Sequence, residues 1–222
     1  MRSGWRGRRW FWRLYRWAAE RLYNELAFLY DPVSWLVSLG RWAGWRALAL
    51  DYVQGTRVLE IGFGTGELLA PLMDRAQYVY GLEPSPAMQK VTARKLRRRG
   101  RQAARLLARV QGLPIADSCL DTIVSTFPAD YILDGTALHE VARVLRRPTE
   151  GAGGTGGRLV VVGMVGYPQI KPPAWGYRLH GPWEPAIERF CQLGEAAGLA
   201  VSCTSRFDHG ARLPVLVAER IS

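Results

Sequence analysis

Cysteine, histidine and lysine are scarce in this 222-residue chain, and each shortage narrows what the protein can be. The three cysteines form no Cys-x-x-Cys pair, so we expect neither a disulfide framework nor a zinc site, and we predict no other metal site. No apolar run reaches the roughly 18 residues that a membrane-spanning helix needs. Together these absences predict a protein of the reducing cytoplasm.

The charge of the chain is strongly unbalanced. Thirty Lys and Arg residues stand against 19 Asp and Glu residues, which gives a net charge of +11, and all but three of the basic residues are arginines. Such a charge favours anionic partners, either nucleic acid or acidic lipid, although a solvated basic surface explains it equally well. The length, with 48% hydrophobic residues, suits one domain with a proper core and a small extension.

Beyond about residue 55 the pattern alternates between strands and helices, which is typical of a doubly wound α/β sheet. The predicted strands cover 57–61, 78–82, 104–110, 121–126, 158–164, 200–206 and 213–220. The predicted helices between them cover 65–74, 86–98, 135–146 and 184–197. We therefore expect a Rossmann-like, seven-stranded, mostly parallel sheet with helices on both faces, in a domain that covers residues 53–222.

Residues 1–52 differ in composition from the rest, because seven of the nine tryptophans lie there among many arginines. Apolar spacings of three and four residues predict a helix over 9–30, broken by Asp31 and Pro32, and a second helical stretch over 33–50. Tryptophan and arginine together prefer the headgroup zone of a membrane. The segment is thus a membrane-surface contact or a helical lid on the main domain, and the two roles are compatible.

The most informative motif is the glycine-rich turn EIGFGTG, Glu60–Gly66, which joins a predicted strand to a predicted helix. Glycine adopts left-handed backbone angles and lets a ligand approach the main chain closely. The N–H groups at the start of the following helix attract a carboxylate or a phosphate. The dinucleotide fingerprint needs glycine at its first, third and sixth positions. Here the sixth position is Glu67, so the turn departs from that fingerprint.

Two acidic residues accompany this turn. Glu60 lies two residues before the first glycine, and Glu83 follows the second predicted strand, 23 residues later. An acid at the tip of the second strand suits the two hydroxyls of a ribose. The turn and its two acids therefore indicate a nucleoside-containing ligand other than a dinucleotide.

With these features in order, the chain resembles the class I S-adenosylmethionine-dependent methyltransferases. Five segments carry the resemblance, which runs from about Gly55 to the C-terminus: EIGFGTG (60–66), GLEPSPAM (81–88), QGLPIADSCLD (111–121), ARVLR (142–146) and GRLVVV (157–162). It implies an antiparallel last strand and S-adenosyl-L-methionine as the cofactor. Methyl transfer from a sulfonium is an in-line displacement, so the protein mainly aligns the reactants and excludes water.

The resemblance also implies which residues contact the cofactor. They are Glu60, Gly62, Gly64, Thr65, Gly66, Glu83, Pro84, Met88, Val110 and Thr126. Glu60 is expected near the amino group of the methionine portion, and Glu83 at the ribose hydroxyls. Met88 or Pro84 would pack on the adenine.

One position departs from the family pattern. An acid after the third strand commonly accepts a hydrogen bond from the adenine amino group, and here that position is Arg109. A guanidinium cannot accept a hydrogen bond. The adenine contact is therefore lost or replaced, either by the backbone of Val110 or by the carboxylate of Asp117.

The acceptor should meet the methyl group beside STFPADY, residues 125–131, which follows the fourth predicted strand. Thr126, Phe127, Asp130 and Tyr131 are candidates for shaping that pocket, with structural packing as the alternative. The segment contains no Asn-Pro-Pro-Tyr-like tetrad, which argues against an exocyclic amine as the acceptor.

No catalytic residue can be assigned from the sequence, and His180, Tyr131 and Asp130 are the candidates. His180 lies in a long aromatic segment after the fifth predicted strand and is the candidate general base.

A fainter resemblance concerns LYDPVSWLVSLG, residues 29–40, followed by RWAGW, residues 41–45. These residues are similar to the entry segment of menaquinone- and ubiquinone-biosynthesis C-methyltransferases. The leading hypothesis is therefore methyl transfer to a small, hydrophobic or lipid-linked acceptor, by a cytoplasmic protein that contacts the inner membrane surface through residues 1–50. An RNA-directed methyltransferase and a non-catalytic binding module remain as alternatives, although no RNA-binding module is recognisable.

Overall fold

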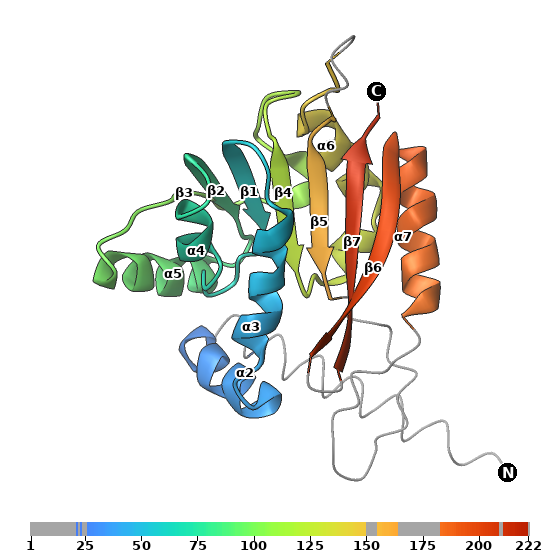
Figure 1. The fold of residues 1–222 in the computed structure, drawn as a ribbon. Helices are drawn as coiled ribbons and strands as arrows, with labels where there is room; N and C mark the ends of the chain where they lie inside the picture. Colours follow the sequence, from blue (N-terminus) through green and yellow to red (C-terminus); the bar gives the residue numbers. More distant parts are fainter. Residues whose placement is uncertain are drawn as a thin grey trace, which may run out of the picture.

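The computed structural model describes residues 21, 23, 26–149, 155–163, 183–208 and 211–221. A seven-stranded sheet runs through them in the order β3-β2-β1-β4-β5-β7-β6 (Figure 1). The strands are β1 (Arg57–Ile61), β2 (Tyr78–Leu82), β3 (Ala104–Leu106), β4 (Thr122–Thr126), β5 (Arg158–Val162), β6 (Leu199–Asp208) and β7 (Ala211–Arg220). The first five pair in parallel, whereas β7 lies antiparallel between β5 and β6. The predicted Rossmann-like sheet with an antiparallel last strand is confirmed.

Helices connect the strands, and short 3-10 turns lie between them. The α-helices are α2 (Tyr30–Ser38), α3 (Trp42–Ala47), α4 (Leu69–Met73), α5 (Pro86–Arg98), α6 (Gly135–Val144) and α7 (Glu184–Ala196). The 3-10 helices are η1 (Ala27–Leu29), η2 (Leu48–Tyr52), η3 (Val110–Gly112) and η4 (Asp130–Leu133). Helix α5 has the predicted bounds, because the Ser85 side chain caps it by accepting from the Met88 N–H and Pro86 needs no N–H partner at the first position.

Several predicted elements are too long, and two of them differ by four residues at one end. The strand predicted over 104–110 ends at Leu106, because Val110 turns into the core and opens η3. The helix predicted over 65–74 is α-helical only from Leu69, since the glycine turn closes on itself first through a 2.8 Å bond from the Gly66 N–H to the Phe63 carbonyl.

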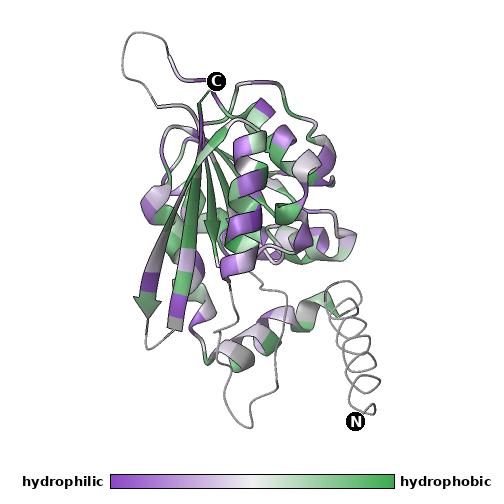
Figure 2. Cartoon of the chain, turned by 90° about the vertical axis from the view of Figure 1, so that its right-hand side faces the viewer, coloured by the Kyte–Doolittle hydropathy of each residue, from purple (hydrophilic) through white to green (hydrophobic). Residues whose placement is uncertain are grey.

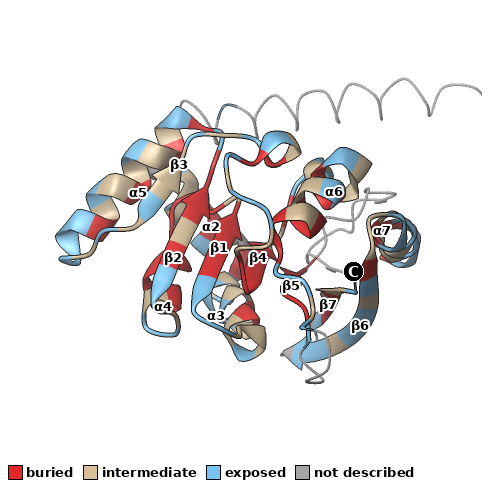
Figure 3. Cartoon of the chain, turned by 90° about the horizontal axis from the view of Figure 1, so that it is seen from above, coloured by how far each residue is buried: buried red, intermediate tan, exposed pale blue. Residues whose placement is uncertain are grey.

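The sheet has an apolar core on each face, and the strand period of two divides the side chains between them. In β5, Leu159 and Val161 face the core formed with α6 and α7, whereas Val160 and Val162 face the core formed with α4 and η2. Figure 3 shows α6 and α7 on one side of the buried strands and α3 and α4 on the other. This doubly wound arrangement leaves the carboxyl ends of the parallel strands as the open edge.

The opposite edge of the sheet is tied together by Asp121, which is 6% exposed. Its Oδ2 atom accepts from the backbone N–H groups of Thr56 and Arg57 at 2.8 and 2.9 Å, and its Oδ1 atom pairs with Arg146 at 2.8 Å. This carboxylate joins the start of β1 to the start of β4.

The helices before β1 lie at the carboxyl edge of the sheet (Figure 1). The prediction that Asp31 and Pro32 break a helix is wrong, because both lie in the first turn of α2, where proline replaces an N–H that has no helical partner. The break comes at Leu39 and Gly40, which adopt left-handed φ angles of 52° and 79°. The part of the predicted 9–30 helix before residue 21 lies outside the described residues. No helix in the described part of the chain is long and apolar enough to cross a membrane.

Candidate functional site

The glycine turn follows β1 at the point where the strand order reverses, since β1 pairs with β2 on one side and β4 on the other. Gly62 and Gly66 have φ angles of 70° and 74°. A Cβ atom on Gly62 would lie 2.7 Å from the Tyr131 hydroxyl oxygen, and one on Gly66 would lie 2.4 Å from the Thr92 methyl carbon. Both positions therefore require glycine for conformation and for space.

A cavity of about 120 Å³ opens against this turn, and we call it the glycine-loop cavity. Three parts of the chain line it: the N-terminal helices, the turn itself and the segment after β4. The lining side chains and backbone come chiefly from Tyr23, Tyr30, Trp42, Arg46, Glu60, Gly62, Gly64, Thr65, Thr126, Phe127 and Tyr131. The cavity is smaller than the ~300 Å³ or more that is usual for a pocket holding a small-molecule ligand. Side chains of the N-terminal helices occupy part of its wall.

Glu60 provides a buried carboxyl at the inner end of the cavity. Its side chain is 2% exposed, and its Oε2 atom has no hydrogen-bond partner among the described residues. The pKa of Glu60 rises from 4.5 to about 8, chiefly because burial penalises the charged form, while Arg46 opposes the rise and Glu83 adds to it. A cationic group bound here would supply the missing partner and favour the ionised carboxylate.

Arg46 comes to the same cavity from α3. Its side chain is half-buried, and its Nε atom has no hydrogen-bond partner within the described part of the chain. A guanidinium presents a planar set of donors that fits a carboxylate. With Glu60 ionised, Glu60 and Arg46 would present opposite charges complementary to the ammonium and carboxylate of a free amino acid, which is the methionine end of the expected cofactor.

Glu83 is fully buried at the end of β2, and protein donors already engage both of its oxygens. Its Oε1 atom accepts from the Ser85 N–H at 2.8 Å, and its Oε2 atom accepts from the Gly64 N–H at 3.1 Å. The Tyr23 hydroxyl also donates to Oε2, at 2.6 Å. Burial, followed by the neighbouring Glu83 carboxylate, raises the pKa of Tyr23 far above its ordinary value, so the phenol stays a donor. The Tyr23 hydroxyl thus donates to the Glu83 carboxylate, which the sequence predicts to accept from the ribose hydroxyls of the cofactor.

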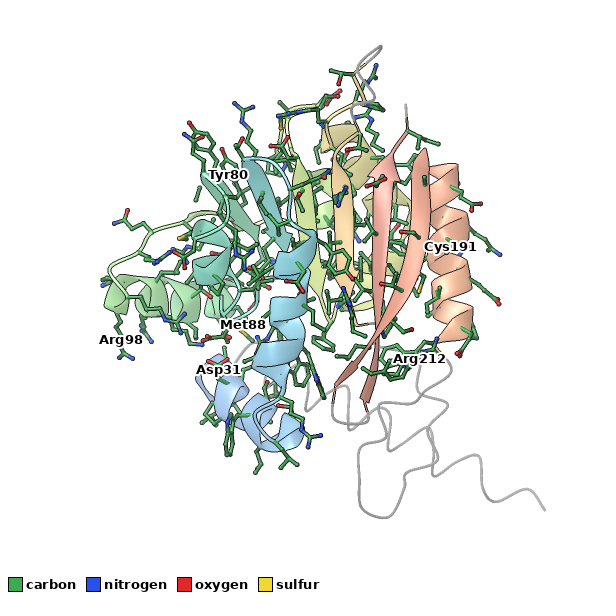
Figure 4. All side chains as sticks on the ribbon, in the orientation of Figure 1. Asp31, Tyr80, Met88, Arg98, Cys191 and Arg212 are labelled. Atoms are coloured by element: carbon green, nitrogen blue, oxygen red, sulfur yellow. The ribbon has the colours of Figure 1, made fainter. Side chains whose placement is uncertain are left out.

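A second contact fastens α2 across the glycine turn. The Asp31 carboxylate accepts from the Thr65 hydroxyl at 2.6 Å and pairs with Lys95 of α5. Lys95 also pairs with Glu67 at 2.7 Å. Figure 4 shows Asp31 on the side of α2 that faces the domain. These contacts hold α2 against the glycine turn, and the role of the N-terminal segment as a lid or a membrane contact stays a prediction.

The segment after β4 forms the wall on the acceptor side. The Tyr131 hydroxyl lies 2.7 Å from the Ser125 hydroxyl and donates to the Ile61 carbonyl at 3.3 Å. Burial raises the pKa of Tyr131 above its ordinary range, although the hydrogen bond with Ser125 opposes the rise. Tyr131 is therefore neutral at physiological pH and is not a base there.

Phe127 gives this wall its aromatic character. It adopts a left-handed φ of 48°, which is uncommon for a bulky residue, and its ring packs edge-on against Trp42 with the ring centroids 5.0 Å apart. Trp45 packs on the same ring with the centroids 6.3 Å apart. Two tryptophans of α3 thus hold a strained Phe127 at the cavity.

The remaining predicted residues lie outside the glycine-loop cavity. Pro84 and Asp130 are exposed, whereas Met88 and Val110 are buried away from its lining. Asp117 forms an ion pair with Arg143 of α6 at 2.5 Å, so its carboxylate is already engaged away from the glycine-loop cavity. The adenine contact therefore stays a prediction.

His180 lies outside the described residues. Among the residues that the structure describes, no cluster of His, Cys, Asp or Glu side chains could hold a metal ion.

Tyr30, Asp31 and Trp42 belong to the segment 29–45 whose resemblance is described above, whereas no sequence feature pointed to Tyr23 or Arg46. Both come from the segment that precedes β1, where aromatic and arginine residues are too common for any one of them to stand out.

Comparison with known proteins identifies the family of the chain. The profile of a family described as a methyltransferase domain matches residues 58–148. A demethylmenaquinone methyltransferase of Thermus thermophilus is 33% identical over 164 residues, which cover 70% of this chain and 67% of that protein. The chain therefore belongs to the class I S-adenosylmethionine-dependent methyltransferases, and its cofactor is S-adenosyl-L-methionine.

A second relative supports the assignment, and a solved structure shows the same fold. A demethylmenaquinone methyltransferase of Thermobifida fusca is 29% identical over 174 residues, covering 73% of this chain and 69% of that protein. The crystal structure of an S-adenosylmethionine-dependent methyltransferase from Aquifex aeolicus covers 86% of this chain and 98% of that one, with a TM-score of 0.59 and 18% identity, and shows the shared fold.

Proposed function

We propose that this methyltransferase acts on a small, hydrophobic acceptor of the prenylated-quinone type, which resides in a membrane. The observation that carries the proposal is the aromatic wall formed by Phe127, Trp42 and Tyr30 at the glycine-loop cavity. Aromatic side chains favour a flat apolar ring over a charged or strongly hydrated acceptor. The names of the two demethylmenaquinone methyltransferase relatives support the same acceptor class.

Three charged side chains would hold the cofactor. Glu60 would accept from its ammonium group, Arg46 would bind its carboxylate, and Glu83 would accept from the ribose hydroxyls once Tyr23 gives way. When bound, S-adenosylmethionine supplies a methyl group that is already activated by the sulfonium. The chain would then align the acceptor with that methyl group and exclude water.

Among the described residues, few groups at the glycine-loop cavity could remove a proton from the acceptor. Tyr131 keeps its proton at neutral pH, and Glu60 is buried on the cofactor side of the cavity. An acceptor that arrives electron-rich, such as the reduced hydroquinone form of a quinone, needs no strong protein base. This agrees with the proposed acceptor class.

The proposal is tested by following methyl-labelled S-adenosylmethionine with three acceptors in parallel: a prenylated naphthohydroquinone in detergent, the same ring without its tail, and bulk RNA. We expect the label to enter the prenylated compound fastest and the Glu83→Ala variant to transfer much less. Label in RNA with none in either quinol would overturn the proposal and support the RNA-directed alternative.

A further inference from the structure

Helix α2 has its polar and apolar sides reversed. Its domain-facing positions include Ser34 and Ser38, which are only 7% and 8% exposed. The Ser38 hydroxyl accepts from the Trp42 N–H at 3.3 Å, so at least part of this buried polarity is satisfied locally. A surface helix normally buries its apolar stripe and exposes its polar one.

The outer side of α2 and the preceding turn is apolar instead. Six of the ten exposed large apolar side chains in the described part of the chain lie between residues 26 and 39, which makes this the main exposed apolar surface among those residues. They are Leu26, Leu29, Val33, Trp35, Leu36 and Leu39. Trp35, Leu36 and Leu39 are 64%, 67% and 72% exposed. We call these six residues the α2 ridge.

The spacing of the ridge residues makes the surface continuous. Leu26, Leu29, Val33 and Leu36 are three or four residues apart, so they follow one line along the helical turns. Nine residues of α2 extend for only ~13 Å, which is far less than the ~30 Å of a hydrocarbon core. A short apolar line of this kind suits a helix that lies in an interface rather than one that crosses it.

The ridge lies at the same end of the molecule as the site. Tyr30 of α2 lines the glycine-loop cavity, and Asp31 is fastened to Thr65 of the glycine turn. The tip of the β6–β7 hairpin reaches the same end in both side views (Figures 1 and 2). Near that tip, Phe207 is 75% exposed.

The positive charge at this end of the molecule favours an anionic partner. Arg41 follows the ridge and is exposed, and Arg206 and Arg212 are exposed near the hairpin tip. The chain as a whole carries a net charge of +11. A second copy would bring the same positive charge to the contact and be repelled, whereas an acidic lipid surface would be attracted.

From the reversed helix and the surrounding arginines we propose that the α2 ridge docks the enzyme on an acidic phospholipid bilayer. The ridge would insert its apolar side chains among the acyl chains, with Phe207 as a second contact and the arginines at the headgroups. Docking would bring the glycine-loop cavity to the surface in which a lipid-linked acceptor lies. The role of docking in reaching a lipid-linked acceptor rests on the proposed function, whereas the binding of the α2 ridge to vesicles does not depend on it.

The test measures co-sedimentation of the full chain with vesicles of equimolar phosphatidylcholine and phosphatidylglycerol, with pure phosphatidylcholine vesicles for comparison. Trp35, Leu36 and Leu39 are replaced together by serine. We expect the partition coefficient on acidic vesicles to fall by about tenfold or more, because three large apolar groups no longer insert. The matched control is Ile221→Ser, an exposed apolar residue just after β7 at the opposite end of the sheet, which should bind as the unaltered protein does.

Cofactor binding of the triple variant, measured by calorimetry, shows whether it is folded, and it should match that of the unaltered protein. Vesicle binding that survives the triple substitution would overturn the proposal. It would also be overturned if the substitution converted a dimer into a monomer without changing vesicle binding, because the ridge would then contact a second copy. If no quinol is methylated but the triple variant still loses vesicle binding, the proposed acceptor is wrong and the docking surface stands.

Discussion

The buried carboxyl of Glu60 makes the stability of the cofactor-free protein depend on pH. Moving the pKa of this group from 4.5 to about 8 corresponds to roughly 5 kcal/mol between the neutral and ionised forms, at 1.36 kcal/mol per pH unit. The folded chain therefore binds up to one more proton than the unfolded chain between these two pH values. The unfolding free energy of the cofactor-free protein therefore decreases as the pH rises through that window, and this decrease is complete above about pH 8.

The variant Glu60→Gln removes this dependence, because glutamine resembles the protonated carboxyl and never ionises. We expect the variant to be more stable than the unaltered protein by a few kcal/mol at pH 9 and by little near pH 5. The observed difference should be below the 5 kcal/mol limit, since Glu60 borders a cavity that admits water.

The assay is urea unfolding without cofactor at several pH values between 5 and 9, followed by circular dichroism for both proteins. The difference in unfolding free energy should widen steadily with pH. Parallel pH profiles for the two proteins would show that Glu60 is already ionised in the folded state, and would refute the reasoning. The same variant should bind S-adenosylmethionine more weakly, because the ammonium loses a charged acceptor.

Three other substitutions probe the remaining contacts. Glu83→Ala should weaken cofactor binding by ~1–3 kcal/mol in calorimetry, the usual loss for charge-assisted hydrogen bonds, and unchanged affinity would show that the ribose lies elsewhere. Tyr23→Phe should tighten cofactor binding roughly three- to tenfold, because it removes the hydroxyl that donates to Glu83. The remote control Tyr52→Phe should leave the affinity unchanged. Weaker binding by Tyr23→Phe would mean that this hydroxyl helps to hold the cofactor. Asp121→Ala should lower the unfolding free energy by ~2–4 kcal/mol in urea titrations, because two backbone N–H groups and Arg146 lose their acceptor, and a loss below ~0.5 kcal/mol would contradict its structural role.

Local signals were enough to predict most of the sheet. The strands at 57–61 and 78–82 and the helix at 86–98 have the predicted bounds, because apolar runs, the Ser85 cap and Pro86 define them independently of tertiary contacts. The third strand is shorter than predicted, since its apolar pattern continues past the point where β2 stops offering partners.

The site was predictable only on its strand side. Glu60 and Glu83 follow from the positions of β1 and β2, whose parallel register places Glu60 opposite Gly81. Tyr23 and Arg46 were not predictable, because they reach the cavity through the way the N-terminal helices dock on the sheet. The structure also exposes Trp35 and Leu36 of α2, although a surface helix normally buries its apolar stripe.

Calorimetric titration with S-adenosylmethionine in two buffers of different ionisation enthalpy tests the central claim most directly. At pH 7 the Glu60 carboxyl, with a pKa of about 8, is largely protonated in the cofactor-free protein and becomes ionised against the cofactor's ammonium. We therefore predict binding that is coupled to the release of up to about 0.9 proton, and that this release disappears in Glu60→Gln. No detectable binding at about 1 mM cofactor, or binding with the same proton release in the variant, would contradict the site described above.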